Sequence, residues 1–305
     1  MIIACEKCET KYNIDENVTS ESAFKVRCYR CSHVFTAFKS PPDEIPLLLE
    51  NEVKPNRDRV IAISNQKGGV AKTSTCINLG ISLSLLKKRV LMIDFDVQSN
   101  LTLLLGYNET KSFYEILDSG TEDLSGIIRK TRYPNLWLLP SNSRMALLTK
   151  KYLLENNFEH FLRDRLDLIK DDYDHILIDT PPSIEFFTLN ALAASNFAII
   201  PSQCEYLSIQ GVRKIEEIIK IISQKDDHDI DYKVLITMYD PNNTSSKVIY
   251  SKIQKRYKDK TFNTVIEHDT KMPESQIVKI PVILYDKKSK SAFQYIKLAK
   301  EILGE

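Results

Sequence analysis

The sequence lacks any apolar stretch near the ~20 residues that a membrane-spanning helix needs. It also lacks an excess of charge of one sign, because 42 Lys and Arg residues face 41 Asp and Glu residues, for a net charge of +1. The segment before Cys5 is too short for a secretory or lipoprotein leader. We find no internal repeat and no low-complexity tract. We therefore expect a cytoplasmic globular protein in which only a local surface carries excess positive charge.

Cysteine is scarce outside one cluster, since Cys76 and Cys204 stand alone and are expected to pack in the core. The other cysteines form two C-x2-C pairs separated by 19 residues, and they are Cys5, Cys8, Cys28 and Cys31. Each pair can aim two thiolates at one point, and four thiolates form the tetrahedral site that Zn²⁺ prefers. An iron site or a redox dithiol is the alternative. A closed four-sulfur site leaves no open position, so we interpret it as structural zinc.

The paired cysteines define a small module at residues 1–37. A module of this size buries too little core to fold alone, so metal binding would supply its folding energy. The segment MIIACEKCETKYNIDENVTSESAFKVRCYRCSHVF resembles the zinc ribbon that begins many bacterial proteins. The resemblance implies a binding or docking module rather than an active site.

A linker and one large domain follow. Residues 38–57 hold four of the twelve prolines and are interpreted as the linker, and residues 58–305 as the main domain. Short apolar, β-branched runs alternate there with helical stretches such as Val212–Ile222 and Met145–Ile169. The runs are Arg59–Ser64, Arg89–Asp94, His175–Asp179, Phe197–Pro201 and Tyr232–Thr237. This alternation predicts an α/β fold with a doubly wound, mostly parallel sheet, preceded by the small zinc ribbon.

The first strand runs into a loop, residues 65–74, that is followed by a predicted helix at Thr75–Leu86. A strand, loop and helix in this order present backbone N–H groups and a helix N-terminus to an anion. Lys72 would lie on the β- and γ-phosphates of a nucleotide, and the Thr73 hydroxyl on Mg²⁺. Gln66 and Ala71 stand where the ordinary phosphate loop has glycine. The loop fits the deviant form K-G-G-x-x-K-[ST]-[ST] instead.

The motifs NQKGGVAKTSTCINLG, VLMIDFDVQSNLT, HILIDTPPS and VLITMYD resemble those of the ParA/Soj partition ATPases, within the MinD/ParA class. The resemblance covers about residues 59–303. It implies a P-loop ATPase that forms a homodimer around ATP and Mg²⁺. Lys67 matches the signature lysine, which crosses the interface to the partner subunit's phosphates. The nucleotide-binding loop is implied to comprise Lys67, Gly68, Gly69, Val70, Ala71, Lys72, Thr73 and Ser74.

Three carboxylates follow predicted strands, at the edge where ligands bind in such sheets. The run from Asp94 to Asn100 matches the family's D-x-D-P-Q-x-N, with Val97 in place of proline. By this match Asp96 positions or polarises the attacking water and Asp94 supports the Mg²⁺ region. Asp179 matches the carboxylate that reaches Mg²⁺. The resemblance therefore implies three catalytic residues, which are Lys67, Lys72 and Asp96.

The family places Pro-Arg-Asn after a later strand, where this chain has Glu267, His268 and Asp269. This chain keeps the position of the motif but not its residue types. On position alone, Glu267 and His268 are the candidates for contact with the adenine.

Positive charge gathers near the end of the chain, where 13 Lys and Arg face 7 Asp and Glu from Lys247 onward. A solvated surface is one interpretation. The family resemblance implies the other, in which the dimer binds DNA without sequence preference through phosphate contacts. The candidate DNA-binding residues are Lys252, Lys255, Arg256, Lys288 and Lys290.

The resemblance implies a nucleoid-associated ATPase that segregates or positions cargo, most simply a chromosome or plasmid with a ParB-like activating partner. One alternative is a MinD-like or other ATPase that positions a protein cluster, and its membrane-bound form would need a basic amphipathic helix at the end of the chain. Another is a nucleotide-switched regulator whose ribbon reads DNA. Residues 1–57 carry no excess of Lys and Arg and no helix-turn-helix pattern, so we expect the ribbon to dock a protein.

Overall fold

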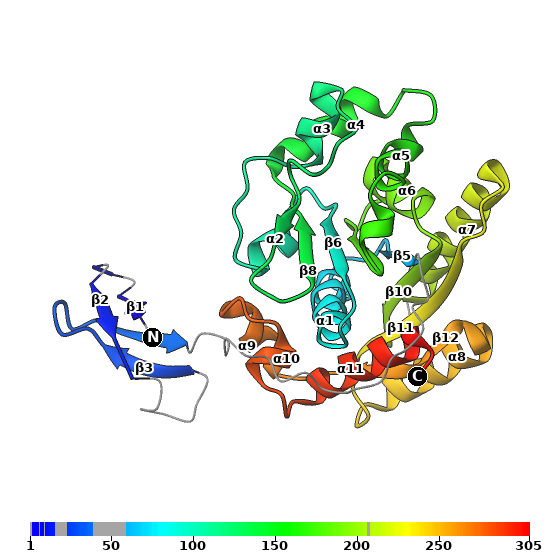
Figure 1. Cartoon of the computed structure of the whole chain (residues 1–305). Coiled ribbons are helices and arrows are strands. Elements are labelled where there is room, and N and C mark those ends of the chain that lie inside the picture. Colours follow the sequence, from blue (N-terminus) through cyan, green and yellow to red (C-terminus); the bar gives the residue numbers. More distant parts are fainter. Residues whose placement is uncertain (1, 6, 9, 16–22, 39–58, 206–207) are drawn as a thin grey trace.

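The computed structural model describes residues 2–5, 7–8, 10–15, 23–38, 59–205 and 208–305. The predicted linker, residues 38–57, therefore lies outside the described residues except for Phe38. The ribbon contains two antiparallel hairpins (Figure 1). Strands β1 (Ile2–Ala4) and β2 (Lys11–Asn13) flank the first cysteine pair, and β3 (Ala23–Arg27) and β4 (Val34–Phe38) flank the second.

The main domain is built on an eight-stranded sheet in the order β12-β11-β10-β5-β9-β6-β8-β7. All neighbouring pairs are parallel except β7 and β8, so the predicted doubly wound, mostly parallel sheet is confirmed. The strands are β5 (Arg59–Ile63), β6 (Val90–Asp94), β7 (Arg129–Lys130), β8 (Leu136–Leu139), β9 (His175–Asp179), β10 (Phe197–Gln203), β11 (Asp231–Tyr239) and β12 (Thr261–Glu267).

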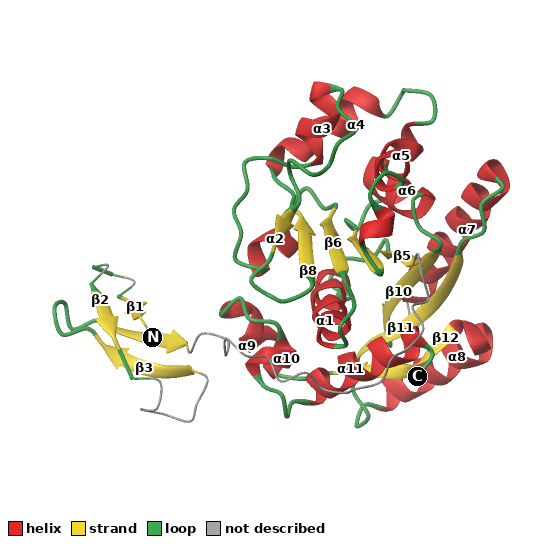
Figure 2. Cartoon of the chain, viewed as in Figure 1, coloured by secondary structure: helices red, strands yellow, loops and turns green. Residues whose placement is uncertain are grey.

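Strand side chains alternate between two apolar layers, which explains why the strands are apolar throughout. Ile61, Ile63 and Met92 belong to one layer, whereas Val60 and Ile93 belong to the other. The first layer is completed by helices α1 (Lys72–Leu85), α2 (Asn100–Leu104), α9 (Lys271–Ile277), α10 (Val282–Tyr285) and α11 (Lys290–Leu303). The second is completed by α3 (Phe113–Ser119), α4 (Ala146–Tyr152), α5 (Phe161–Leu166), α6 (Phe186–Ala193), α7 (Ser208–Asp226) and α8 (Thr244–Tyr257). Figure 2 shows the strands between these two groups of helices.

The expected helix at Met145–Ile169 is wrong as one element. The structure breaks it into α4, a 3₁₀ turn at Phe158–His160 and α5. Asn157, just before the 3₁₀ turn, has a φ of 59°. This left-handed conformation cannot continue an α-helix, and asparagine tolerates it better than most residues. The break therefore lies at a polar, exposed segment between two apolar ones.

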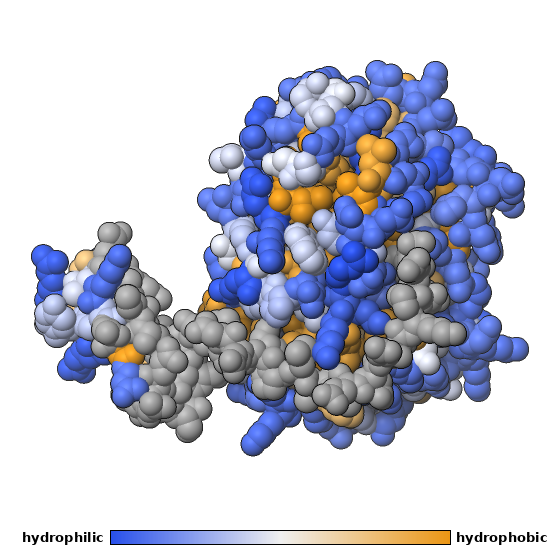
Figure 3. Space-filling view, in the orientation of Figure 1, coloured by the Kyte–Doolittle hydropathy of each residue, from blue (hydrophilic) through white to orange (hydrophobic). Residues whose placement is uncertain are grey.

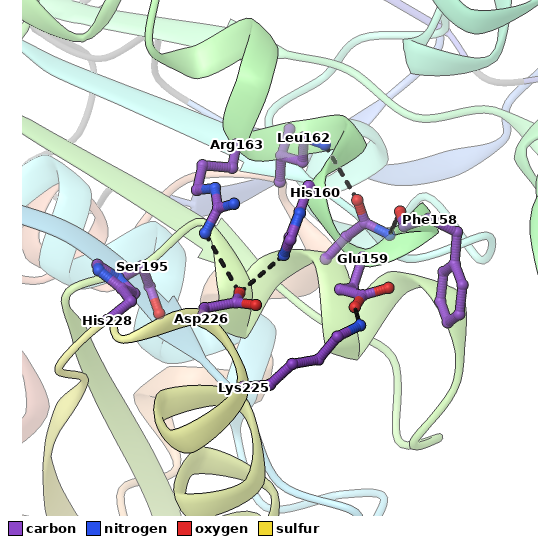
Figure 4. A network of polar contacts seen from close by, with 10 residues as sticks. Phe158, Glu159, His160, Leu162, Arg163, Ser195, Lys225, Asp226 and His228 are labelled. Carbon is purple, nitrogen blue, oxygen red and sulfur yellow. Dashed lines mark hydrogen bonds and ion pairs between the residues drawn. The ribbon is translucent and has the colours of Figure 1, made fainter. Parts of the chain in front are cut away.

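A polar network anchors the end of α7 to this broken segment (Figure 4). Asp226, whose side chain is 5% exposed, lies 2.7 Å from His160 Nε2 and accepts a hydrogen bond of 3.2 Å from Arg163. The neighbouring Lys225 pairs with Glu159. A nearly buried carboxylate requires such partners, because an unpaired buried charge is strongly destabilising. These contacts fix the last turn of α7.

The last helix, α11, uses its apolar face inside the domain. Tyr295, Leu298 and Ile302 are buried in the layer that also contains α1, and the Tyr295 hydroxyl lies 3.3 Å from Thr75 Oγ1. This face is therefore not free to lie on a membrane as the MinD-like alternative requires. Within the described part of the chain, no helix is both long and apolar enough to cross a bilayer. On the face shown in Figure 3, hydrophilic side chains dominate and hydrophobic ones form separate small areas.

Candidate nucleotide site and zinc centre

The phosphate loop connects β5 in the middle of the sheet to α1. Strand order reverses at β5, where such sheets open a crevice at the carboxyl ends of their strands. Gly69 and Ala71 have positive φ values of 74° and 68°. Ala71 thus adopts the conformation that glycine provides in the ordinary motif, and it holds it at a steric cost. Helix α1 then begins at Lys72, three residues before the predicted start.

The loop backbone is open to a ligand. Gly68 and Gly69 are exposed, and apart from their chain neighbours no atom of the described residues lies within 4 Å of the position that a Cβ would take at either residue. Glycines in such loops let the backbone N–H groups approach phosphate closely. The base of the loop is held tightly instead. The Asn65 side chain donates to Pro201 O at 2.7 Å and accepts from the Lys67 N–H at 3.0 Å.

Lys72 is 7% exposed, and its amine donates to the Lys67 carbonyl at 3.2 Å. Burial lowers the pKa of this amine, and the charges of Asp179 and Asp96 oppose the shift. A buried cation at a helix N-terminus is well suited to an anionic ligand.

Asp94 and Asp179 end the neighbouring strands β6 and β9, lie opposite each other in register and are fully buried. Asp94 already has partners, since it accepts from the N–H and the hydroxyl of Thr102 at 2.8 and 2.6 Å. Burial raises its pKa to about 7 despite these bonds. Its Oδ2 atom thus holds α2 through Thr102, and its Oδ1 atom accepts from the Asp96 N–H at 3.3 Å.

Asp179 is different, because neither of its carboxylate oxygens has a hydrogen-bond partner among the described residues. Burial, and secondarily the charge of Asp94, raise its pKa well above the ordinary value. The Thr73 side chain opposes this rise without forming a bond of normal geometry. Unpartnered buried carboxylate oxygens beside a hydroxyl are the donor set that a hard cation such as Mg²⁺ prefers. Asp179 and Thr73 therefore fit the Mg²⁺ that the sequence predicts.

Asp96 lies in the turn after β6 and is 6% exposed. One carboxylate oxygen accepts from the Gln98 N–H at 3.0 Å, and its carbonyl accepts from the Ser141 hydroxyl at 2.7 Å. These bonds fix the turn, which contains Val97 in place of the family's proline. Burial lowers the pKa of Lys72, and the negative charge of Asp96 is one of the charges that oppose this shift.

Lys67 has partners that the sequence did not reveal. Its amine contacts Glu205 and lies 3.4 Å from the Gln203 side-chain oxygen. Gln203 ends β10 and Glu205 follows two residues later, so both partners are more than 130 residues away along the chain. Of the predicted loop residues, Val70 is buried, and the Ser74 hydroxyl accepts from Gln276 at 2.8 Å.

Of the two adenine candidates, Glu267 is the last residue of β12, which lies next to β11, and His268 follows it. Glu267 is already engaged, because its carboxylate pairs with Lys290 at 3.1 Å and its N–H donates to Gln294 at 2.9 Å. His268 is exposed, and its N–H donates to Tyr239 O at 2.9 Å. Both residues lie where the strands end at their carboxyl termini, which is the same end of the sheet as the phosphate loop.

The predicted basic residues lie on two elements. On α8, Ile249, Ile253 and Tyr257 are buried. Lys252, Lys255 and Arg256 are exposed on the opposite side, and Lys288 and Lys290 are exposed at the start of α11. Because Lys290 pairs with Glu267, part of its charge is offset, whereas no such pair is recorded for Lys288 within the described residues.

The four clustered cysteines come together as predicted. The sulfur atoms of Cys5, Cys8, Cys28 and Cys31 all lie within 4.8 Å of one another. Burial opposes ionisation of Cys28, but hydrogen bonds from the Tyr12 hydroxyl and the Cys31 N–H lower its pKa, whereas a backbone bond from His33 only opposes the rise in the pKa of Cys31 that burial and the neighbouring cysteines cause. A thiol that ionises readily suits a metal ligand, because Zn²⁺ binds the thiolate. The donor set fits structural Zn²⁺, whereas Cys76 and Cys204 are buried elsewhere.

Known proteins resemble both parts of the chain. The profile of a family described as an AAA domain matches residues 58–232, and that of a zinc-ribbon domain matches residues 1–36. The sporulation initiation inhibitor protein Soj of Bacillus subtilis is 36% identical over 248 residues, which are 80% of this chain and 98% of Soj. The chromosome partitioning protein ParA of Myxococcus xanthus is 33% identical over 249 residues, or 80% of this chain and 88% of that protein.

Among solved structures, cobyrinic acid a,c-diamide synthase from Mycobacterium smegmatis with bound ADP and magnesium is similar, with a TM-score of 0.69 and 31% identity. The match covers 80% of this chain and 94% of that one. Sequence relatives, the deviant phosphate loop and the buried carboxylates point to the same conclusion. The chain belongs to the ParA/Soj family of P-loop ATPases and carries a zinc-ribbon domain before its ATPase domain.

Proposed function

We propose that the protein is an ATPase that dimerises on ATP, binds DNA without sequence preference and segregates or positions cargo together with a ParB-like activating partner. The observation that supports it best is the fully buried Asp179 at the end of β9, which has no hydrogen-bond partner among the described residues and lies beside Thr73 of a phosphate loop of the ParA form. The names of the Soj and ParA relatives support chromosome or plasmid partitioning as the process. Such a protein would act in the cytoplasm at the nucleoid.

In this proposal the loop from Lys67 to Ser74 binds the phosphates, with Lys72 as the buried cation. Thr73 and Asp179 would hold Mg²⁺, which supplies charge neutralisation at the phosphates. Asp94 keeps β6 and α2 in place through Thr102. Asp96 orients and polarises water, because its carboxylate is fixed close to the loop by the Gln98 N–H.

Lys67 has a separate role. It opens the loop and is 30% exposed, so its side chain can reach beyond its own subunit. We propose that it contacts the phosphates of the partner subunit in the dimer. A charge-assisted donor that arrives only on dimerisation completes the site only when two subunits meet.

DNA binding is expected to depend on Lys288 and Lys290. Changing both to Glu should abolish ATP-dependent binding to DNA while ATP-driven dimerisation persists, since neither residue belongs to the phosphate loop. Each phosphate contact contributes about one unit to the salt slope, and a dimer doubles the contacts. Because Glu267 already offsets Lys290, Lys288→Glu alone should weaken binding more than Lys290→Glu alone.

The measurement is binding to two unrelated duplexes, with and without ATP, at several salt concentrations. Lys150→Glu with Lys214→Glu is the control, because it makes the same charge change at exposed lysines of α4 and α7. We expect the control and wild type to bind both duplexes alike. Undiminished binding by the Lys288 and Lys290 double variant would place the DNA site elsewhere.

The ribbon is proposed to dock a protein partner, with its zinc as a structural ion. A strong preference of the full chain for one duplex would instead favour the regulator in which the ribbon reads DNA.

A further inference from the structure

The amine of Lys67 is already engaged within its own subunit. It forms an ion pair with Glu205 and lies 3.4 Å from the side-chain oxygen of Gln203. Gln203 is the last residue of β10, and Glu205 lies two residues further along the chain, before α7. The side chains of Lys67 and Glu205 are 30% and 59% exposed, so this pair lies at the surface and water can replace either partner.

Gln203 joins this contact to the phosphate loop. Its amide nitrogen donates to the Gly69 carbonyl at 2.8 Å and lies 2.8 Å from the sulfur of Met238 at the end of β11. One side chain therefore contacts Lys67, the middle of the loop and a neighbouring strand. A displacement of the Lys67 amine removes one of the partners that fix the Gln203 side chain.

The backbone of Lys67 is held independently of these contacts. Its N–H donates to Asn65, whose side chain packs against Gly211 of α7. A Cβ at Gly211 would lie 2.5 Å from Asn65 Oδ1, so glycine is required for this close approach. The loop can consequently stay in place while only the side chain of Lys67 moves.

We propose that Glu205 and Gln203 are positioning residues that hold Lys67 within its own subunit and so set how readily ATP drives dimerisation. The inference rests on the proposed function, in which Lys67 contacts the partner subunit's phosphates. In the proposed dimer, the Lys67 amine leaves the carboxylate of its own subunit to reach a phosphate of the partner subunit. Dimerisation must therefore break the contact with Glu205 in each subunit.

The size of the effect follows from the exposure of the pair. An exposed ion pair shifts an equilibrium by up to about fivefold. The dimer releases two lysines, so removing the pair should tighten the dimer by up to about 25-fold. The expected changes are thus a small increase in the availability of Lys67 and a larger decrease in the dimer dissociation constant.

Availability of Lys67 is tested without nucleotide, by the rate at which an amine-acylating reagent labels each lysine, read by mass spectrometry. We expect Glu205→Gln and Gln203→Ala to raise labelling of Lys67 about two- to fivefold. Glu274→Gln is the matched control, because Glu274 pairs with Lys271 at 2.7 Å and both side chains are 40% exposed. It should raise labelling of Lys271 and leave Lys67 unchanged. Unchanged labelling of Lys67 in Glu205→Gln would overturn the inference.

The consequence for dimerisation is tested by the dimer dissociation constant with a non-hydrolysable ATP analogue and Mg²⁺. Glu205→Gln should lower it, and Glu274→Gln, with the same change in charge, should not. A dimer that is unchanged or weaker in Glu205→Gln would contradict the inference while the proposed function stands. A wild-type chain that stays monomeric would instead contradict the proposed function, and the labelling would still decide whether Glu205 holds Lys67.

Discussion

Replacing Asp96 by Ala should reduce ATP hydrolysis by about 100-fold or more while the affinity for ATP stays within a few fold. The carboxylate is nearly buried, and it bonds to the Gln98 N–H within its own turn rather than to the phosphate loop. Its loss therefore removes the group proposed to polarise water and leaves the loop intact. Phosphate release in a single turnover measures the rate, and binding of a fluorescent ATP analogue measures the affinity.

Asp96→Asn separates charge from structure. The asparagine side chain can still accept the bond from Gln98, so the turn should persist while the negative charge is gone. We expect hydrolysis to fall in both variants. A normal rate in either one would contradict the role that the proposal gives to Asp96.

Removal of zinc should unfold the ribbon and leave the ATPase domain folded. Among the described ribbon residues, the buried core consists of Cys5 and Cys28, with a few partly buried neighbours such as Tyr12 and Val26. This core cannot offset the entropy of ordering the chain, whereas a structural Zn²⁺ contributes about 10–16 kcal/mol. We expect one zinc per chain, lost on chelation or in Cys28→Ser, with ATP hydrolysis retained.

Elemental analysis and NMR spectra of the full chain check this expectation. Cys204→Ser is the control, since that buried cysteine lies outside the cluster and the variant should keep its zinc. Freshly purified wild-type protein without zinc would refute the structural role of the metal. Loss of the ATPase fold on chelation would show that the two domains are not independent.

Five of the eight strands of the main domain, β5, β6, β9, β10 and β11, were predictable because each is apolar and rich in β-branched residues. His175–Asp179 has the predicted bounds, and the predicted run at Phe197–Pro201 extends two residues further to Gln203. That extension matters for the site, because it is what places Gln203 against Gly69. Hydrogen bonding to β11 along the whole of β10 continues the strand past its apolar part.

Helix boundaries were less predictable. Lys72 and Thr73 belong to α1 because the turn before it closes at Ala71, a left-handed residue that propensity does not reveal. The break at Asn157 likewise depends on one backbone conformation within a segment of helical pattern. The antiparallel edge strand β7, Arg129–Lys130, has two residues and no apolar pattern of its own.

At the site, sequence motifs predicted the residues of the loop and the carboxylates at the strand ends, and the structure brings them to one edge of the sheet. Motifs could not reveal that Glu205 and Gln203 meet Lys67, because that contact depends on β10 lying beside β5. They also could not reveal that Glu267 is paired with Lys290. Such pairings are set by strand order and by side-chain packing, which a local pattern does not encode.

The most direct test of the proposed function is the mass of the protein in solution with Mg²⁺ and ATP, compared with Mg²⁺ and ADP. Wild type with ADP should be monomeric, and Asp96→Ala with ATP should be a stable dimer, because hydrolysis can no longer separate the subunits. Lys67→Ala should lose dimer under the same conditions. If wild type and Asp96→Ala both remain monomeric with saturating ATP, the ATP-dependent dimer is contradicted.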